Sequence, residues 1–216
     1  GNTSESNALL ITIDTGADAK PVISTTDSAT NDDTPSVTGI ARPGSTVTLF
    51  INDSDTGVTV DADATSGIFS ITAPSQQDGI HDIYILTPNQ AGDDVLKSSS
   101  ISLIIDTSID KPVISTESSD LNPSDVTPII EGTAEADSTV TLLSSGVAIG
   151  TTTANGDGQF SITTSTLADS NYVLTVTATD AAGNISDASD SLSITIDATA
   201  PAKPIITTTT SLTNDS

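Results

Sequence analysis

A segment containing an aspartate followed by a Lys-Pro pair occurs three times in this 216-residue chain. It reads ITIDTGADAKPVIST from Ile11, LIIDTSIDKPVIST from Leu103 and ITIDATAPAKPIITT from Ile194, and its aspartates lie 92 and 91 residues apart. Shorter matches lie between these segments in a constant order: TPSVTG with TPIIEG, STVTLF with STVTLL, and FSIT twice. A repeat of this length requires a fold in which about ninety residues form one structural unit.

The repeat divides the chain into four parts. We expect complete units at 14–105 and 106–196. Residues 1–13 are expected to form the last strand of a preceding repeat, and residues 197–216 a linker and the first strand of a following one. The chain does not begin with a basic and then apolar signal segment, and we interpret it as part of a longer array.

Apolar and polar residues alternate with a period of two within each unit. Short alternating runs separated by Gly, Asn, Asp and Pro are typical of half-buried antiparallel strands. The second unit has seven such runs, around 112–116, 127–134, 138–144, 147–153, 159–164, 171–179 and 190–196. Seven short strands in about ninety residues is the strand count of an immunoglobulin-like sandwich. We therefore predict an all-β chain of tandem seven-stranded immunoglobulin-like β-sandwiches arranged end to end.

Composition agrees with this fold and excludes several functions. With two Tyr, three Phe and no Trp, the core must be built mainly from Val, Ile, Leu and Ala. A net charge of −24 opposes binding to nucleic acid or to anionic membranes. No run of about 18 apolar residues predicts a membrane span. Because the chain has no cysteine and one histidine, no nucleophile–base arrangement is found, and we predict that it is not an enzyme.

The expected topology predicts which loops share one end of a sandwich. Strands run alternately up and down, so the connections after the second, fourth and sixth strands lie at the pole where the chain enters. In the second unit these connections contain Glu135, Asp157 and Asp180, and Asp106 enters at the same pole. Gathered carboxylates repel one another unless a cation binds between them, and calcium accepts six to eight oxygen ligands in flexible geometry. We therefore predict a calcium site formed by Asp106, Glu135 and Asp180, with Asp157 as a further candidate and with the equivalent junction positions Asp14 and Asp197.

Each of these residues also has an interpretation that needs no metal. Asp180 is expected to accept hydrogen bonds from the backbone of its own turn, as Asp often does. Asp157, in the sequence NGDG, can also be interpreted as a turn residue. Glu135 is equally a solvated loop residue, and Asp106 a cap of the linker. Both interpretations are open at this point.

The first unit differs at the corresponding pole. Glu135 aligns with Arg42, and Asp180 aligns with Asn89. We hypothesise that Arg42 pairs with Asp14 in place of calcium, because the planar guanidinium suits carboxylate pairing. The joint before the first unit would then bind calcium weakly or not at all; the alternative is that Arg42 points to solvent.

Two other features of the first unit are interpreted as structural. His81 aligns with Tyr172 near the start of the sixth strand, where a corner tyrosine is expected. Residues 53–67 contain an insertion relative to the second unit, and Val58 and Val60 are expected to protrude there as part of a variable loop.

Four segments carry a resemblance to a known family: the D-x-T/A…KP-x-I junction, TPIIEGTAEADSTVTLL, NGDGQFSIT and VTATDAAGNIS. They resemble the bacterial immunoglobulin-like repeats of giant type I-secreted, biofilm-associated adhesins. The resemblance covers nearly the whole chain and implies a rod-like stalk braced by calcium, secreted or on the bacterial cell surface. Its implied partners are the neighbouring repeats of the same chain. The adhesion target is not implied, and the sequence has neither glycine-rich nonapeptide calcium repeats nor a ligand-binding head.

Together these inferences predict a stalk segment of a secreted adhesin that supports cell adhesion and biofilm formation. Two alternatives remain. A module that binds a glycan or a host protein needs exposed aromatic or arginine anchors, and this sequence has few. An accessory module of an extracellular hydrolase depends on a catalytic domain elsewhere in a longer protein.

Overall fold

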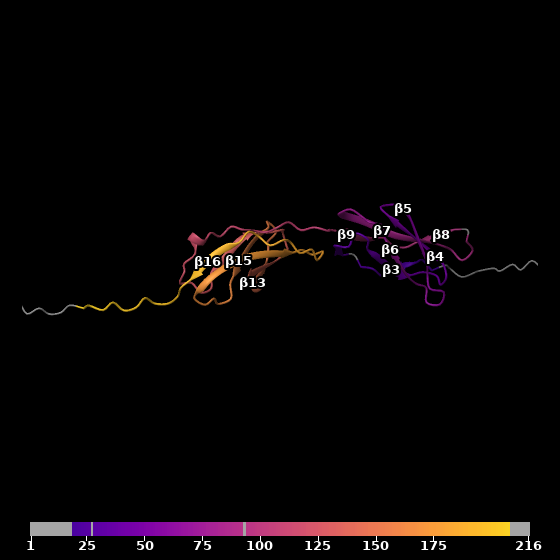
Figure 1. Cartoon of the computed structure of the whole chain (residues 1–216). Helices are drawn as coiled ribbons and strands as arrows, with labels where there is room; N and C mark the ends of the chain where they lie inside the picture. The colour runs from indigo at the N-terminus through magenta and orange to yellow at the C-terminus, as the bar shows by residue number, and fades with distance from the viewer. Residues whose placement is uncertain (1–18, 27, 93, 208–216) are drawn as a thin grey trace, which may run out of the picture. The chain divides into compact units, whose positions relative to one another are not determined.

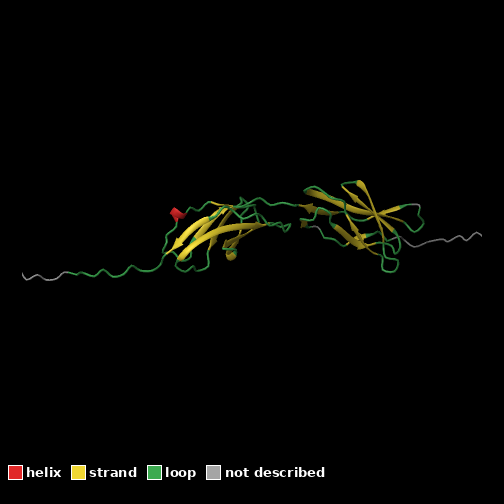
Figure 2. Ribbon diagram, in the orientation of Figure 1, coloured by secondary structure: helices red, strands yellow, loops and turns green. Residues whose placement is uncertain are grey.

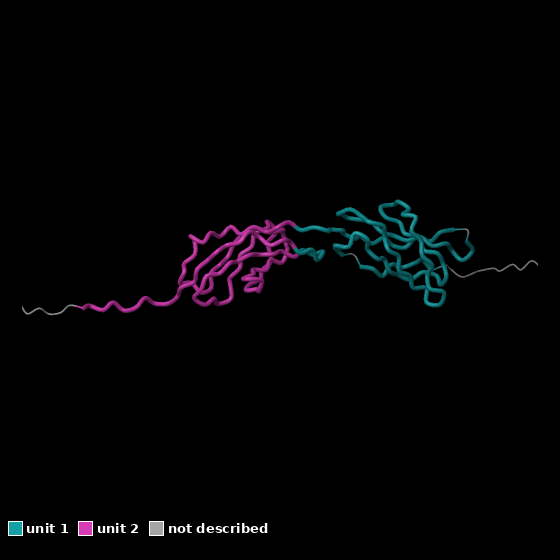
Figure 3. Tube along the Cα trace, in the orientation of Figure 1, with its two compact units in different colours: residues 1–109, 180–185 teal, residues 110–179, 186–216 magenta. Residues whose placement is uncertain are grey.

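A computed structural model of the chain describes residues 19–26, 28–92 and 94–207. The strand expected within 1–13, the junction residue Asp14 and residues 208–216 of the expected following repeat lie outside these ranges. The chain divides into two compact units, Gly1–Ile109 with Asp180–Ile185 and Asp110–Thr179 with Ser186–Ser216 (Figure 3). The described residues form strands, turns and one 3-10 helix, Ser118–Asp120, so the prediction of an all-β chain is confirmed (Figure 2).

The second unit contains two antiparallel sheets. One has the order β10 (Val113–Ile114), β11 (Ile129–Thr133), β14 (Gln159–Thr163). The other has the order β13 (Val147–Thr153), β12 (Thr139–Ser144), β15 (Ser170–Thr179), β16 (Leu192–Ile196) (Figure 1). Each of the seven runs expected from the sequence forms a strand, and no strand end differs from its expected position by more than two residues.

The period-two pattern places every second side chain of these strands in the core. In β11 and β14 buried and exposed residues alternate strictly. The buried residues of the two sheets form one cluster of aliphatic side chains and a single phenylalanine. Its largest fully buried members are Ile130, Leu142, Ile162 and Leu174. Packing of two sheets through their inner faces is the arrangement of a β-sandwich.

One glycine in each unit lets a phenylalanine pack directly onto the strand opposite. Gly132 pairs with Phe160, and a Cβ atom on Gly132 would lie 2.5 Å from Cζ of that ring and 2.1 Å from the carbonyl oxygen of Val113. Gly39 and Phe69 form the same pair in the first unit. No side chain fits at these positions without displacing the backbone, so the glycine is a requirement of the core.

The first unit repeats the smaller sheet and enlarges the other. Its smaller sheet has the order β1 (Val22–Ile23), β3 (Ser36–Ile40), β6 (Ile68–Thr72). The larger sheet has the order β2 (Ala29–Thr30), β9 (Ile101–Ile105), β7 (Gly79–Pro88), β4 (Thr46–Ile51), β5 (Ser54–Asp61), and β8 (Val95–Lys97) also pairs with β7. β2 runs parallel to β9, whereas the other pairs are antiparallel.

The expectation of a protruding loop at 53–67 is wrong for its first half. Residues Ser54–Asp61 form strand β5, and Val58 and Val60 are half-buried against the core of the first unit. The chain reverses directly from β4 into β5 because Asn52 and Asp53 adopt φ angles of 50° and 59°. Asn and Asp tolerate this left-handed conformation, which is the one required by a tight hairpin turn.

The corner position predicted for His81 and Tyr172 is confirmed. The hydroxyl of Tyr172 donates to the carbonyl of Ala168 at 3.0 Å and accepts from its amide at 3.1 Å. In the first unit Nε2 of His81 lies 2.8 Å from the carbonyl oxygen of Gln77, which is also four residues earlier. Each side chain therefore ties the start of its strand to the preceding loop, and His81 has a structural partner.

Candidate metal centre

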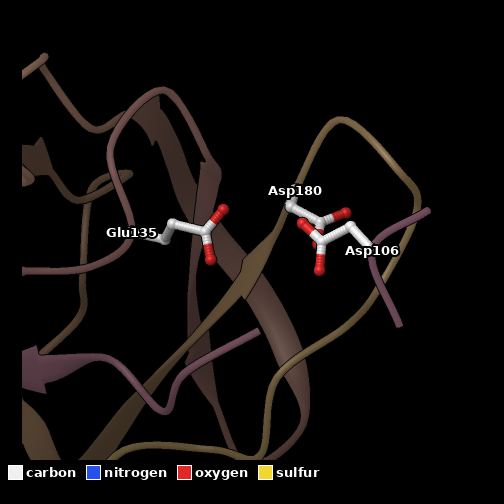
Figure 4. Close-up of side chains that lie close together, drawn as sticks. All are labelled: Asp106, Glu135 and Asp180. Carbon is white, nitrogen blue, oxygen red and sulfur yellow. The ribbon is translucent and has the colours of Figure 1, made fainter. Parts of the chain in front are cut away.

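Three of the four carboxylates expected at the N-terminal pole of the second repeat lie together. Asp106 directly follows β9, Glu135 lies in the loop between β11 and β12, and Asp180 directly follows β15. Each offers one carboxylate oxygen, and these oxygens all lie within 4.8 Å of one another. The three residues are half-buried, and Figure 4 shows the carboxylate of Glu135 directed toward those of Asp106 and Asp180.

Hydrogen bonds fix Asp180 in this position. Its Oδ1 accepts from the backbone amides of Gly183 and Asn184 at 2.7 and 2.9 Å, and its Oδ2 accepts from Nδ2 of Asn184 at 2.7 Å. Burial acts to raise the pKa of Asp180, but the bonds from Asn184, Gly183 and Ala182 outweigh it and lower the pKa. Asp180 therefore holds its own turn, as the simpler interpretation expected, and presents an ionised carboxylate to the cluster.

Asn184 connects the turn to the start of the repeat, a role that the sequence reasoning missed. Its Nδ2 also donates to the backbone carbonyl of Asp106 at 2.7 Å. The amide thus bridges Asp180 and Asp106 across the pole. The available signal was its position at the end of the turn DAAGN, four residues after Asp180.

The equivalent turn of the first unit uses the same geometry without the charge. Oδ1 of Asn89 accepts from the amides of Gly92 and Asp94 at 2.7 and 3.3 Å. The bond to Gly92 corresponds to the bond that Asp180 accepts from Gly183, since both span three residues. A carboxylate is therefore not needed to hold the turn, and Asp180 gives the second repeat a charge that its backbone does not require.

The two other members of the cluster also have hydrogen-bonded backbones. The amide of Asp106 donates to the carbonyl of Thr30 at 3.0 Å, and Oδ1 of Asp106 accepts from the amide of Ser108 at 3.3 Å. The carbonyl of Glu135 accepts from the hydroxyl of Ser138 at 2.7 Å and from its amide at 3.2 Å. Separate segments of the chain therefore deliver the three carboxylates from ordered positions.

The chemistry of the cluster favours a hard cation. Two unit charges 4.8 Å apart repel by about 1 kcal/mol at the dielectric constant of water, and by about 3.5 kcal/mol at an effective dielectric constant near 20. A divalent cation between the carboxylates replaces this repulsion by attraction. The donors are all oxygens, which suits hard divalent cations better than zinc or copper. The three residues could hold a metal ion, and within the described ranges no other group of three His, Cys, Asp or Glu residues meets the same criterion.

Two of the expected acidic residues lie outside this cluster. Asp157 is exposed, and its amide donates to Oδ1 of Asn155 at 3.0 Å within a turn. Asp197 is also exposed, and its Oδ1 accepts from the amide of Thr199 at 3.2 Å. The structure thus gives both residues local partners and does not bring them together with the other three.

The hypothesis about the first joint stays a prediction, because Asp14 lies outside the described residues. Arg42 is half-buried, and its Nε is buried without a hydrogen-bond partner in the described part of the chain.

Paired sheets with these strand orders define both units as immunoglobulin-like sandwiches. Residues 17–107 and 114–198 each match the bacterial Ig-like domain, so the chain belongs to this family. The predictions of tandem immunoglobulin-like sandwiches and of a bacterial immunoglobulin-like repeat family are confirmed by these two matches. No catalytic family is indicated, and no curated protein is significantly similar in sequence.

Several solved structures are similar to the chain, all with low TM-scores. The BSP domain of a biofilm-associated protein is 26% identical over 84% of this chain and 30% of its own, with a TM-score of 0.34. An intimin fragment solved with the intimin-binding domain of its translocated receptor is 12% identical over 84% of this chain and 64% of its own, with a TM-score of 0.40. The Bacteroides ovatus mixed-linkage glucan utilization protein SGBP-B, solved with a heptasaccharide, is 17% identical over 82% of this chain and 48% of its own, with a TM-score of 0.31. The chain thus spans less than a third of the solved BSP-domain chain, and the family assignment rests on the two domain matches. Within the described residues, no helix has the length and apolar character needed to cross a membrane.

Proposed function

We propose that the chain is a structural stalk segment of a large secreted bacterial cell-surface adhesin, stiffened by calcium, that supports cell adhesion and biofilm formation. The family and the tandem repeats support this proposal. The observation that carries it is the convergence of Asp106, Glu135 and Asp180 at the start of the second repeat. No enzymatic activity is proposed, and the partners are the neighbouring repeats of the same chain.

Calcium would act on the connection between two repeats. Strand β9 ends at Ile105 and β10 begins at Val113, so seven residues, 106–112, connect them. Asp106 is the first of these residues, whereas Glu135 and Asp180 belong to loops of the second repeat. A cation bound to all three fixes the beginning of the connection onto that repeat and removes conformations that a free linker samples.

The cluster supplies three carboxylates, and a calcium shell needs more oxygens than that. Backbone carbonyls and water complete such shells readily, because calcium accepts irregular geometry, whereas magnesium demands a tighter octahedron. Extracellular calcium modules commonly have dissociation constants of about 10⁻⁴–10⁻³ M. The joint would therefore be occupied outside the cell and empty at the low calcium concentration of the cytoplasm, which leaves the chain pliable during export.

Small-angle X-ray scattering on the whole chain, with millimolar calcium and with a chelator, tests the proposal. Calcium is expected to increase the maximum dimension and to narrow the distribution of conformations. Glu135→Gln removes one ligand and is expected to abolish the change, whereas the matched control Asp157→Asn, at an exposed residue outside the cluster, is expected to keep it. A maximum dimension that calcium leaves unchanged in the wild-type chain would rule out calcium stiffening.

Calorimetric titration separates binding from stiffening. The wild-type chain is expected to bind calcium in the range of about 10⁻⁴–10⁻³ M, and Glu135→Gln to bind at least tenfold more weakly. Binding without a change in scattering would leave a calcium site but not a brace.

A further inference from the structure

The loop after β13 contains an Asn-Gly pair whose side-chain oxygen is held by two backbone amides. Oδ1 of Asn155 accepts from the amide of Asp157 at 3.0 Å and from the amide of Gln159 at 2.8 Å. The backbone of Asn155 closes the turn, donating to the carbonyl of Gln159 and accepting from the amide of Gly158, both at 2.8 Å. The carboxamide of Asn155 is thus fixed and polarised, although the residue is exposed.

The next residue, Gly156, leaves the other side of this carboxamide open. Gly156 is exposed, and a Cβ atom built on it would meet nothing within 4 Å. In the described part of the chain its amide donates no hydrogen bond. The nitrogen of Gly156 is therefore free to react with Cγ of Asn155, and no side chain hinders closure of the five-membered ring.

We propose that Asn155 is a site of spontaneous covalent modification through a cyclic imide. The nitrogen of Gly156 loses its proton to solvent and attacks Cγ, forming a C–N bond. The carboxamide C–N bond then breaks, and ammonia leaves with a proton. One water molecule opens the imide at either carbonyl, giving aspartate or isoaspartate at position 155.

The two amides that bind Oδ1 assist the first step. Negative charge develops on this oxygen in the tetrahedral intermediate, where N–H groups at hydrogen-bond distance stabilise it as in an oxyanion hole. The donors, from Asp157 and Gln159, are in place before the reaction starts. The folded turn therefore promotes the reaction at this asparagine.

The first repeat shows that the turn accepts the aspartate product. Asp63 occupies the equivalent place after β5, and its amide donates to the carbonyl of Ile68 at 2.9 Å. Its Oδ1 accepts from the amides of Thr65 and Ser66 at 3.0 and 2.7 Å. Hydrogen bonds from Ser66 and Thr65 lower the pKa of Asp63. The aspartate product keeps this arrangement, whereas isoaspartate lengthens the backbone and disrupts it.

The reaction also changes the surroundings of the acidic cluster. The carbonyl of Gly158 accepts from the amide of Ala134 at 2.8 Å, and the carbonyl of Ala154 accepts from the amide of Asp137 at 3.2 Å. These bonds join the loop of Asn155 to the loop that carries Glu135. Each modified molecule therefore gains a negative charge in a loop hydrogen-bonded to that of Glu135.

Peptide mapping by mass spectrometry on the whole chain, incubated at neutral pH, tests the proposal. A synthetic peptide of residues 151–160 and the internal residue Asn184, which precedes the branched Ile185, serve as comparators. We expect conversion at Asn155 at least as fast as in the peptide, both products in the digest, and Asn184 unchanged. Slower conversion in the folded chain than in the peptide would mean that the turn protects Asn155, and the proposal would be rejected.

Gly156→Ala supplies the second variant. The open space around Gly156 allows the added methyl group without a clash, so the fold is expected to be retained and is checked by circular dichroism. The methyl group hinders ring closure, and conversion is expected to slow severalfold. An equal rate in this variant would exclude attack by the nitrogen of residue 156.

Discussion

Replacing Asp180 by asparagine separates the charge of this position from its hydrogen bonds. The amide oxygen can still accept from the amides of Gly183 and Asn184, as that of Asn89 does in its own turn. One hydrogen bond is lost, because the new amide nitrogen faces Nδ2 of Asn184. This loss lowers the free energy of unfolding by about 1 kcal/mol. The change also removes two repulsions across distances up to 4.8 Å, worth about 2 kcal/mol together at the dielectric constant of water, before screening by salt reduces them. In chelator the two effects nearly cancel, and the unfolding temperature is expected to change little.

The wild-type chain and Asp180→Asn are expected to differ in how much calcium raises the unfolding temperature. At about 10 mM calcium and dissociation constants of 10⁻⁴–10⁻³ M, binding stabilises the wild-type repeat by about 1.4–2.7 kcal/mol. For a domain of this size that corresponds to about 6–20 °C in unfolding temperature. Asp180→Asn is expected to reduce the shift by about 4–10 °C, since a tenfold loss of affinity in this range removes about 1.0–1.3 kcal/mol of the stabilisation.

Differential scanning calorimetry of the whole chain, with calcium and with chelator, measures this shift. Asp157→Asn is the matched control: it makes the same chemical change at the same pole, at an exposed residue outside the cluster, and should retain the full shift. A calcium-induced shift of wild-type size in Asp180→Asn would refute the assignment of Asp180 as a ligand.

Three further changes test the fold itself. Gly132→Ala forces a methyl group into the carbonyl oxygen and phenyl ring described above and is expected to destabilise the second repeat by about 1–3 kcal/mol or more in urea unfolding; Gly156→Ala, in open space, should change it by less than about 0.5 kcal/mol. Tyr172→Phe removes the hydroxyl that ties the strand to its loop and should cost about 0.5–1.5 kcal/mol by the same measurement. The hydroxyl of Thr199 and neighbouring amides lower the pKa of Asp169 below its ordinary value of 3.8. This carboxylate therefore stabilises the fold above that pH, and the contribution is lost as the pH falls through the lowered pKa. Unfolding measured from about pH 5 downward should therefore show a smaller acid-induced loss of stability in Asp169→Asn than in the wild type, and an identical loss would contradict the role given to the carboxylate.

The sandwich could be predicted because each strand carries its own local signal. Alternation within β15 and β16 marks both the strand and its buried face, since the side chains of Leu174, Val176, Ile194 and Ile196 must all point inward. The pole at which each loop lies follows from the number of strands and their alternating direction. This alternation predicts that Asp106, Glu135 and Asp180 lie at one end of the second repeat.

Other features had no local signal. Strand β2 has two residues, and its parallel pairing with β9 depends on contacts made only in the folded unit. The length of β5 depends on how tightly Asn52 and Asp53 turn, and the sequence alone predicted a loop at 53–67. The pole at which a loop lies does not show whether its side chain reaches the cluster, as Asp157 illustrates. One end of a sandwich is wider than the reach of a carboxylate, and a turn can direct a side chain outward. Asn184 was missed because an amide between two acidic groups carries no charge.

The turn shared by Asn89 and Asp180 has a consequence for proteins assembled from such domains. A carboxamide and a carboxylate hold it through the same oxygen, so exchanging one for the other keeps the bend and, under the proposed calcium site, decides whether this corner supplies a charged ligand. Under that proposal, a single substitution at this corner would set the stiffness of one connection between domains without any change to the domains themselves.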